Sequence, residues 1–561
     1  MKRIPITFLV ACLLFVTGIK AQSIADGIND LYAERYKGAQ ATFEKLLATN
    51  PNSIEASYWL GQTFLANKDI KSARDVYSKA LMASANAPLL IVGMGQVELN
   101  EKNTSAATQR FETAITMTRG KKGDDPVILN AIGRAIVNTY TDREKIGDIN
   151  YAVDKLEQAV QKDPNNADAL VNLGTAYLKA KPGEGGGRAF ENYTKANQVN
   201  PNFPLASYRL GKLFYSQKNW ELYEKYMTEA VTKDPRFAPA YYDLYYYKLG
   251  KLDFAGAQDM ATKLIANSDP DPQAEHFKAQ TYWAEKKYDE AINISQQIIK
   301  NAGDQTKPRT YVLLADSYLG KGDTASAKQY IDLYFAKAKP DDITPAHWKM
   351  KGDSYLFIPG QEETAMNAYM EAIKVDTVLS SKLDNLAAMS ATFKRRKLYD
   401  KQAAVEQMIL DMKPNPSLTN YFNATLAYYF DSAYDKSRDL SLKMQEKFPT
   451  EIYGWQWAFN SARAVDTVKK DSIAVPDALK LFDFVQKDSV KYKSLYMTTA
   501  LFLVDYYINH AKDAPKALEF IKRAVGMDPT NESYKKIQEQ IEKSMKRTGN
   551  TNATTRDAKT G

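Results

Sequence analysis

Residues 170–201 read LVNLGTAYLKAKPGEGGGRAFENYTKANQVNP, and residues 207–235 read SYRLGKLFYSQKNWELYEKYMTEAVTKDP. Both stretches carry Leu-Gly, an aromatic residue three positions after the glycine, and then Ala and Pro. These residues are Leu173, Gly174, Tyr177, Ala196 and Pro201 in the first stretch, and Leu210, Gly211, Phe214, Ala230 and Pro235 in the second. Apolar residues recur at helical spacing, and the residue before proline is disfavoured in a helix. Each stretch therefore predicts a hairpin of two helices.

The same pattern recurs along nearly the whole chain. Further copies contain Leu60, Gly61, Phe64, Ala73 and Tyr77; Gly95, Ala107, Phe111 and Ala114; Ala315, Tyr318 and Ala327; Trp348, Gly352, Tyr355 and Tyr369; and Ala517, Ala524 and Pro529. About thirteen copies follow one another at a period of roughly 34 residues. In these residues the chain resembles the tetratricopeptide repeat family.

The resemblance implies an all-α, right-handed superhelical solenoid of about thirteen helical hairpins. Small residues at the eighth position of each repeat, such as Gly61 and Gly211, let the two helices of one hairpin approach closely. The aromatic residues fill the gap to the next hairpin, so each hairpin buries its apolar face by stacking on a neighbour.

The repeats vary along the chain and indicate a division into domains. We expect an N-terminal array over residues 22–340, and a divergent array with a capping helix over residues 341–546. Residues 380–416 keep amphipathic spacing without the Leu-Gly signature. Residues 547–561 are polar and predict a disordered tail.

Residues 1–21 have the composition of a signal peptide. Lys2 and Arg3 precede an apolar run, and Ala21 offers a small residue at the cut before Gln22. The sequence thus predicts a periplasmic or secreted protein. In the alternative, Cys12 ends a lipobox-like stretch and anchors a lipoprotein to a membrane. No later stretch predicts a transmembrane helix.

The residue types needed for most catalytic and metal sites are scarce. Cys12 is the only cysteine and lies in the leader, and the three histidines are far apart in sequence. The repeats leave no room for a separate catalytic domain of about 150 residues. We expect no catalytic residues, no metal site and no cofactor. Because 75 basic and 67 acidic residues are mixed along the chain, we also expect no nucleic-acid partner.

A partner-binding surface is predicted from the resemblance. In the family, positions 5, 9 and 12 of each repeat line a concave groove. Over three consecutive repeats these positions hold six residues that we take as candidate partner-binding residues. They are Tyr208, Tyr215, Tyr242, Tyr246, His276 and Trp283. An alternative is that some of these rings only pack between helices.

Together these observations predict a non-enzymatic scaffold of the bacterial cell envelope. It is expected to bind a protein or peptide partner through its concave groove, since flat rings contribute large contact area at low entropic cost. A second hypothesis is a glycan- or peptidoglycan-binding envelope protein that uses the groove aromatics. Association with outer-membrane components is compatible with either.

Overall fold

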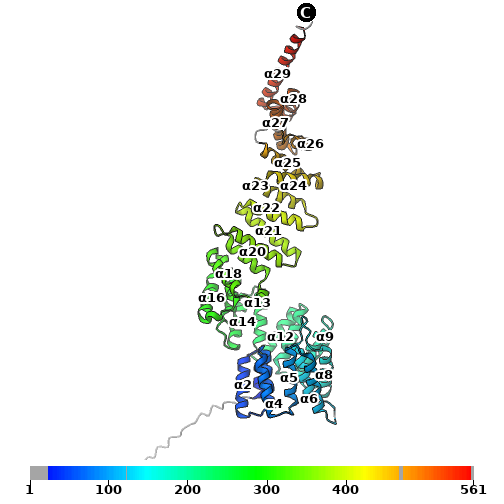
Figure 1. The fold of residues 1–561 in the computed structure, drawn as a ribbon, viewed down its shortest axis with the longest axis vertical. Coiled ribbons are helices and arrows are strands. Elements are labelled where there is room, and N and C mark those ends of the chain that lie inside the picture. The colour runs from blue at the N-terminus through cyan, green and yellow to red at the C-terminus, as the bar shows by residue number, and fades with distance from the viewer. Residues whose placement is uncertain (1–22, 122, 467–471, 558–561) are drawn as a thin grey trace, which may run out of the picture. The chain divides into compact units, whose positions relative to one another are not determined.

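A computed structural model describes residues 23–121, 123–466 and 472–557 of the chain. The predicted signal peptide, residues 1–21, and the alternative lipid attachment site Cys12 lie outside the described residues. Within these residues the fold is all-α, as predicted, and one isolated β-bridge joins Gly120 and Gly123. The helices α1–α28 pair in order into fourteen hairpins, and α29 follows them (Figure 1).

The chain divides into two compact units, Met1–Tyr334 and Phe335–Gly561. The helices of the first unit are α1 (Ile24–Tyr32), α2 (Tyr36–Thr49), α3 (Ile54–Ala66), α4 (Ile70–Ala83), α5 (Pro88–Asn100), α6 (Thr104–Thr118), α7 (Pro126–Thr139), α8 (Ile149–Lys162), α9 (Ala167–Ala180), α10 (Gly186–Val199), α11 (Pro204–Ser216), α12 (Trp220–Lys233), α13 (Ala238–Gly250), α14 (Phe254–Asn267), α15 (His276–Ala284), α16 (Tyr288–Ala302) and α17 (Pro308–Lys321). The helix α18 (Thr324–Lys337) contains the boundary.

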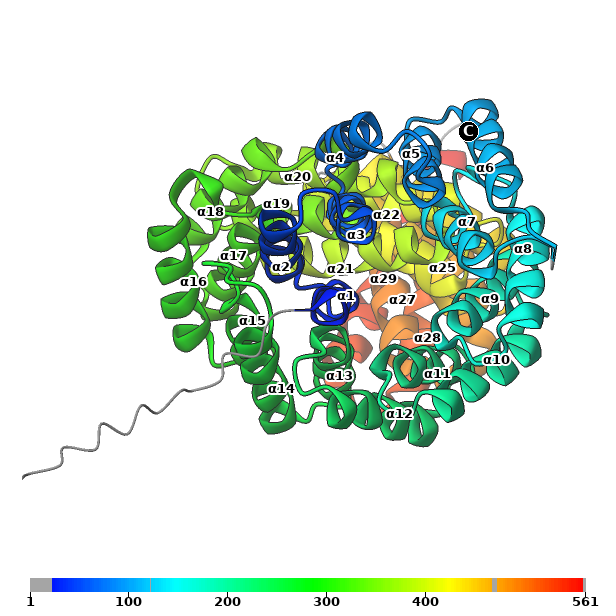
Figure 2. The ribbon, with the colours of Figure 1, turned by 90° about the horizontal axis from the view of Figure 1, so that it is seen from below.

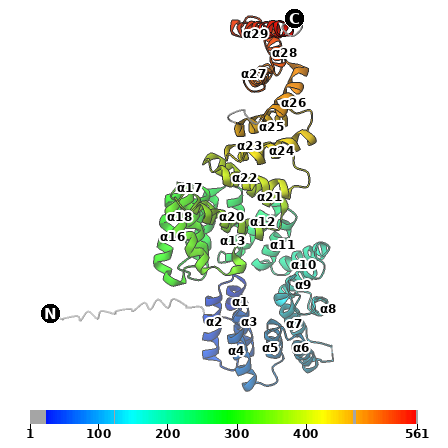
Figure 3. The ribbon, with the colours of Figure 1, turned by 45° about the horizontal axis from the view of Figure 1, so that its top comes forward.

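The second unit continues the succession of hairpins (Figure 3). Its helices are α19 (Pro345–Leu356), α20 (Glu362–Val375), α21 (Leu379–Arg395), α22 (Tyr399–Met412), α23 (Leu418–Phe430), α24 (Tyr434–Lys447), α25 (Ile452–Val465), α26 (Val475–Val485), α27 (Lys493–Asn509), α28 (Ala514–Met527) and α29 (Glu532–Asp557). Short 3₁₀ turns lie at Gly303–Gln305, Pro340–Asp342 and Gln486–Asp488.

The second helix of several hairpins ends where Asp-Pro or Asn-Pro occurs in the sequence. The helices α2, α8, α10, α12 and α28 each end one residue before that pair, at Thr49, Lys162, Val199, Lys233 and Met527. Helical geometry is disfavoured before proline, and proline lacks the N–H that would extend the helix. These predicted helix ends are confirmed.

The turn between the two helices of a hairpin repeatedly holds one residue at positive φ. These residues have φ between 57° and 65° and include Glu34, Lys68, Lys102, Lys218, Leu252 and Lys286. In this series Glu34 alone carries a carboxylate. The turn that holds Glu34 faces a cavity.

The glycines at the eighth position bring helices into contact, as predicted. A Cβ atom built on Gly61 would lie 2.2 Å from the ring of Tyr77, and one built on Gly93 of the next hairpin would lie 2.5 Å from the same ring. Tyr77 is fully buried between them. The ring therefore fills both the space inside its own hairpin and the space to the next one.

The first hairpin contacts repeats that lie far along the chain. The hydroxyl of Tyr32 donates a hydrogen bond to Asp168, at the start of α9. The carboxylate of Asp30 lies 3.2 Å from the guanidinium of Arg236, which immediately precedes the α13 segment. Ala33, in the α1–α2 turn, is buried in the apolar core of α9–α13. The first hairpin is thus packed against the fifth and sixth hairpins as well as against the second.

The start of α2 contacts the loop after α14. The backbone N–H groups of Lys37 and Gly38 donate to the Asp269 carboxylate at 2.7 and 3.3 Å, and the Lys37 ammonium donates to the Pro270 carbonyl at 3.0 Å. These contacts link the first hairpin to the end of the seventh. We call residues 24–270 the closed turn. Figure 2 shows its helices following a curve that returns to α1.

The second unit ends in a helix that contributes to the core. Ile541 of α29 is buried in the same cluster as Phe482 and Phe520, so α29 covers the last hairpin. The helix continues past Lys546 to Asp557, into the stretch predicted to be a disordered tail, because residues 547–557 contain no proline to end it. The domain limits drawn from the sequence otherwise stay predictions.

Candidate functional site

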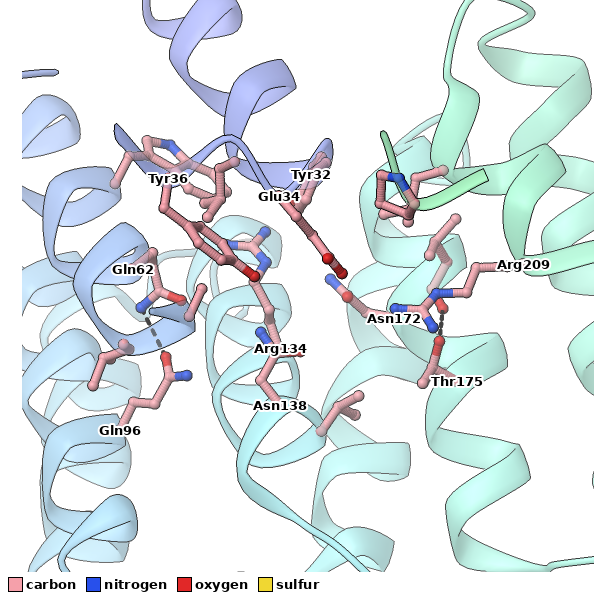
Figure 4. A pocket seen from close by; sticks show the side chains of 18 of the residues that line it. Tyr32, Glu34, Tyr36, Gln62, Gln96, Arg134, Asn138, Asn172, Thr175 and Arg209 are labelled. Carbon is pink, nitrogen blue, oxygen red and sulfur yellow. Dashed lines mark hydrogen bonds between the residues drawn. The ribbon is translucent and has the colours of Figure 1, made fainter. Parts of the chain in front are cut away.

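A cavity of about 370 Å³ lies inside the closed turn. It is walled by the first helices of hairpins two to six and by the turn between α1 and α2 (Figure 4). Its polar lining residues are Glu34, Gln62, Lys68, Gln96, Asn100, Arg134, Asn138, Asn172, Thr175 and Arg209. Because five of these are Asn or Gln, we call it the amide cavity.

The amides offer both donors and acceptors to the cavity. Gln62 donates to the Gln96 side chain at 2.7 Å and to the Tyr77 hydroxyl at 3.0 Å. These bonds use the amino group of Gln62 and the carbonyl oxygen of Gln96, so the carbonyl of one and the amino group of the other stay available. Aromatic rings of Tyr36, Trp59 and Tyr208 complete the wall. The lining suits a small polar ligand.

A polar layer separates the amide cavity from a second cavity of about 920 Å³. Tyr32, Trp59 and Arg134 line both cavities and therefore form the partition between them. The Arg134 guanidinium lies over the Trp59 ring, 4.6 Å from its centroid. One of the three partition residues, Tyr32, comes from the first hairpin, so the partition depends on closure of the turn.

Asp168 is the centre of the hydrogen bonds that hold this layer. It accepts from Tyr32 and Arg134, from the Asn130 amide at 2.7 Å and from the Asn172 amide at 3.1 Å. Burial alone would raise the pKa of this carboxyl. The Arg134 charge and the hydrogen bonds from Tyr32 and Asn130 outweigh that effect and lower its pKa. Asp168 is therefore held as a carboxylate.

Glu34 and Arg209 place opposite charges on the amide cavity from distant parts of the chain. Burial raises the pKa of Glu34, and the nearby Arg209 charge lowers it in part. Yet the side chain of Glu34 is solvent-exposed, so it is surrounded by protein while facing the water of the cavity. Figure 4 shows its carboxylate and the Arg209 guanidinium extending toward each other.

The six residues predicted from the sequence fall into separate groups. Tyr242 and Tyr246 lie side by side on α13 with ring centroids 4.9 Å apart, and Tyr242 packs edge-on against Phe277 at 5.8 Å. They are 44% and 38% exposed. The Arg309 guanidinium lies over the Phe277 ring, 5.6 Å from its centroid. We call Tyr242, Tyr246, Phe277 and Arg309 the tyrosine surface.

The other predicted tyrosines have different surroundings. Tyr208 packs on Phe237 at 5.4 Å and lines the amide cavity. Tyr215 is exposed at the end of α11, where it contacts Trp220 edge-on at 5.5 Å. Trp283 is half-buried on α15. The three residues do not join the tyrosine surface through the ring contacts found in the described part of the chain.

His276 differs from the expectation that it faces a partner. It is only 6% exposed, at the first residue of α15, and the charges of Lys307 and Arg309 lie near enough to affect its pKa. Burial, together with the charges of Arg309 and Lys307, lowers its pKa to about 3. His276 is therefore a neutral, buried side chain near neutral pH.

The amide cavity was missed in the sequence although a signal for it was present. The ninth repeat position, which follows Gly61, Gly95, Gly133 and Gly174, holds Gln62, Gln96, Arg134 and Thr175. Counting that position in the early repeats finds four cavity residues. Glu34 has no such signal, since the same turn position in other repeats holds lysine, leucine or serine.

No cluster of three or more potential metal ligands occurs among the described residues. None of the described helices is both long and apolar enough to cross a membrane.

The repeat pattern is found in known proteins. Residues 25–88 and 308–334 each match a family model described as tetratricopeptide repeat. A stretch of 245 residues is 27% identical to Protein CTR9 homolog of Arabidopsis thaliana, and it covers 42% of this chain and 21% of that protein. The chain thus matches about a fifth of that relative's length.

Solved structures with some likeness include two bacterial repeat proteins. The C-terminal part of a repeat-containing protein from Cytophaga hutchinsonii is 22% identical with a TM-score of 0.30, covering 46% of this chain and 98% of that one. A tetratricopeptide repeat protein from Parabacteroides merdae is 19% identical with a TM-score of 0.34, covering 42% and 91%. Yeast Tom70 is 11% identical with a TM-score of 0.35, covering 66% and 95%.

Proposed function

We propose that the chain is a non-enzymatic scaffold that binds a partner protein through the tyrosine surface, because residues 25–88 and 308–334 match tetratricopeptide repeat models and such repeats generally mediate protein–protein interaction. The proposal rests on one observation. Tyr242 and Tyr246 stay 44% and 38% exposed although each ring is held by aromatic neighbours.

The tyrosine surface has the composition of an interaction hot spot. Tyr and Arg dominate such sites because they combine large contact area with directional polar groups. Tyr242 and Tyr246 contact each other and Phe277, so little side-chain freedom is left to lose when a partner binds. Arg309 adds a positive charge beside the rings. A partner segment with an apolar or aromatic side chain and a nearby carboxylate fits this surface.

The proposed location is the bacterial cell envelope. The support is the composition of residues 1–21, with the small residue Ala21 before Gln22. Fractionation and N-terminal sequencing test this: a periplasmic or secreted chain that begins at Gln22 is expected. An acylated chain that begins at Cys12 would instead support a membrane-anchored lipoprotein.

Affinity capture from envelope extracts tests the scaffold itself. The bait is the mature chain, and the test variant carries Tyr242→Ala and Tyr246→Ala. The matched control is Tyr453→Ala, which removes a tyrosine of similar exposure, 39%, from the second unit. We expect a partner captured by the wild-type chain and the control to be lost from the double variant, with a weakening of roughly 2–4 kcal/mol.

Two other results would count against this proposal. Capture of the same partner by the double variant at equal affinity would remove the tyrosine surface from the binding site. If the double variant no longer binds glycan or peptidoglycan fragments but still binds its protein partners, the glycan-binding hypothesis would be favoured.

A further inference from the structure

The amide cavity contains two unpaired opposite charges that the scaffold function does not use. Glu34 and Arg209 both line it, and neither has a hydrogen-bond or ion-pair partner among the residues that the structure describes. The Nε atom of Arg209 is buried without an acceptor. A buried donor without a partner is costly, so a ligand that supplies an acceptor removes that cost.

The surroundings of these two groups exclude simple alternatives. The pair is too far apart to form an ion pair with each other, and the nearby carboxylate of Asp243 is already bonded to Lys212 at 3.0 Å. Arg134, the other arginine of the cavity, is neutralised by Asp168. Besides these groups the cavity is lined by one further cation, Lys68, so it presents the carboxylate of Glu34 and the cations Arg209 and Lys68.

We propose that the amide cavity binds a short peptide with both ends free, whose carboxylate pairs with Arg209 and whose ammonium pairs with Glu34. A carboxylate and an ammonium on one small molecule are opposite in sign to Arg209 and Glu34, respectively. Charge-assisted hydrogen bonds of this kind are about twice as strong as neutral ones.

The rest of the wall matches the middle of such a ligand. A peptide bond has one donor and one acceptor, and a side-chain amide pairs with both. The Asn172 side chain lies near the two charges, and Gln96 and Asn138 line other parts of the cavity wall (Figure 4). The volume of about 370 Å³ lies in the range of roughly 300–1,000 Å³ that is usual for small-ligand sites.

The site is also selective against long chains. The α1–α2 turn, which carries Glu34, is fixed by Tyr32, Asp30 and Lys37 to three distant points of the closed turn. A ligand whose end must reach Glu34 therefore meets this turn and cannot continue past it. The site thus suits free peptide ends better than an internal segment of a protein.

Isothermal titration of the mature chain with triglycine, N-acetyl-triglycine and triglycine amide tests the proposal. We expect triglycine to bind, and blocking of either end to weaken binding by about tenfold or more, which corresponds to roughly 1.4 kcal/mol per charge contact. Because this comparison uses the wild-type chain, it does not depend on the folding of a variant.

Two variants assign the ends. Arg209→Gln should abolish the preference for triglycine over its amide, and Glu34→Gln should abolish the preference over the N-acetyl peptide. Lys225→Gln, an exposed change on the neighbouring helix α12 outside the cavity, should leave both preferences intact. Equal binding of the three peptides to the wild-type chain, or no triglycine binding at millimolar concentration, would overturn the proposal. The outcome is independent of the tyrosine surface, which these variants leave unchanged.

Discussion

Two glycines at the same repeat position should respond very differently to alanine. Both Gly61 and Gly211 lie where two helices of a hairpin touch. A Cβ on Gly61 would lie 2.2–2.5 Å from two ring carbons and the hydroxyl oxygen of Tyr77, whereas a Cβ on Gly211 would lie 2.9 Å from the terminal methyl of Met227. The first neighbour is a rigid ring and the second is the end of a flexible chain.

The Tyr77 ring cannot move away from a new methyl group. Gly93 closes its other side, and the Tyr77 hydroxyl donates to the Tyr58 carbonyl and accepts from Gln62, both at 3.0 Å. Overpacking costs about 1–3 kcal/mol, and a displaced buried hydrogen bond costs about 1 kcal/mol more. Alanine regains about 1 kcal/mol of helix propensity. We expect Gly61→Ala to destabilise by roughly 1–3 kcal/mol.

Gly211→Ala has the same gain in helix propensity and a smaller steric cost, because Met227 can adopt another rotamer. Its stability should change by less than about 1 kcal/mol in either direction. Amide hydrogen exchange over α3–α5 and α11–α13, together with urea unfolding, measures the two variants. If both variants are destabilised equally, or if Gly61→Ala does not change stability, the fixed Tyr77 ring does not set the spacing of the hairpins.

Three further predictions concern the closed turn and the tyrosines. Tyr32→Phe removes the hydrogen bond to the Asp168 carboxylate and should cost roughly 1.5–3 kcal/mol of stability. We expect faster hydrogen exchange over residues 24–49 with little change in the second unit. Equally faster exchange in both units would contradict this prediction. The pKa of Asp168 is lower in the folded chain than in the unfolded chain, where it is about 3.9. Its contribution to stability is therefore complete above about pH 3.9 and is lost as the pH falls through the folded pKa. Acid should loosen the first hairpin more in the wild-type chain than in Asp168→Asn. The paired change Tyr242→Ala and Tyr246→Ala should weaken partner binding with little loss of thermal stability. In contrast, Phe111→Ala empties a buried site against Gly95 and should cost roughly 3–5 kcal/mol of stability. Similar melting losses in both variants would show that the two tyrosine rings belong to the core.

The hairpins could be predicted because their signals are local. The eighth-position glycine, the aromatic residue of the second helix and the Asp-Pro end all act within one repeat, and the structure confirms each of them. Even residues 380–416, which lack the signature, form α21 and α22, because Leu386, Met389 and Phe393 are buried at helical spacing. A helical period is enough to predict such elements.

The candidate site was harder to predict from the sequence, because it depends on contacts between the first hairpin and hairpins far along the chain. The contact between Tyr32 and Asp168 joins residues 136 positions apart, and nothing in either neighbourhood marks it. The placement of Glu34 on a cavity follows only from that closure. The exposure of Tyr242 and Tyr246 follows from their repeat positions, whereas His276 is buried although it was expected to face the groove. Partner binding by Tyr242 and Tyr246 stays a prediction.

The closed turn affects when the first hairpin can fold during synthesis of the chain. Synthesis delivers the first hairpin before any of its distant contacts exist, since Asp168, Arg236 and Asp269 are translated later. Until α9–α13 emerge, Ala33 lacks the core in which it is buried and Tyr32 lacks its bond to Asp168, so both stay available to chaperones. Release of the nascent chain from such a chaperone should therefore follow synthesis of α13, and a chain truncated before residue 168 should remain bound to it.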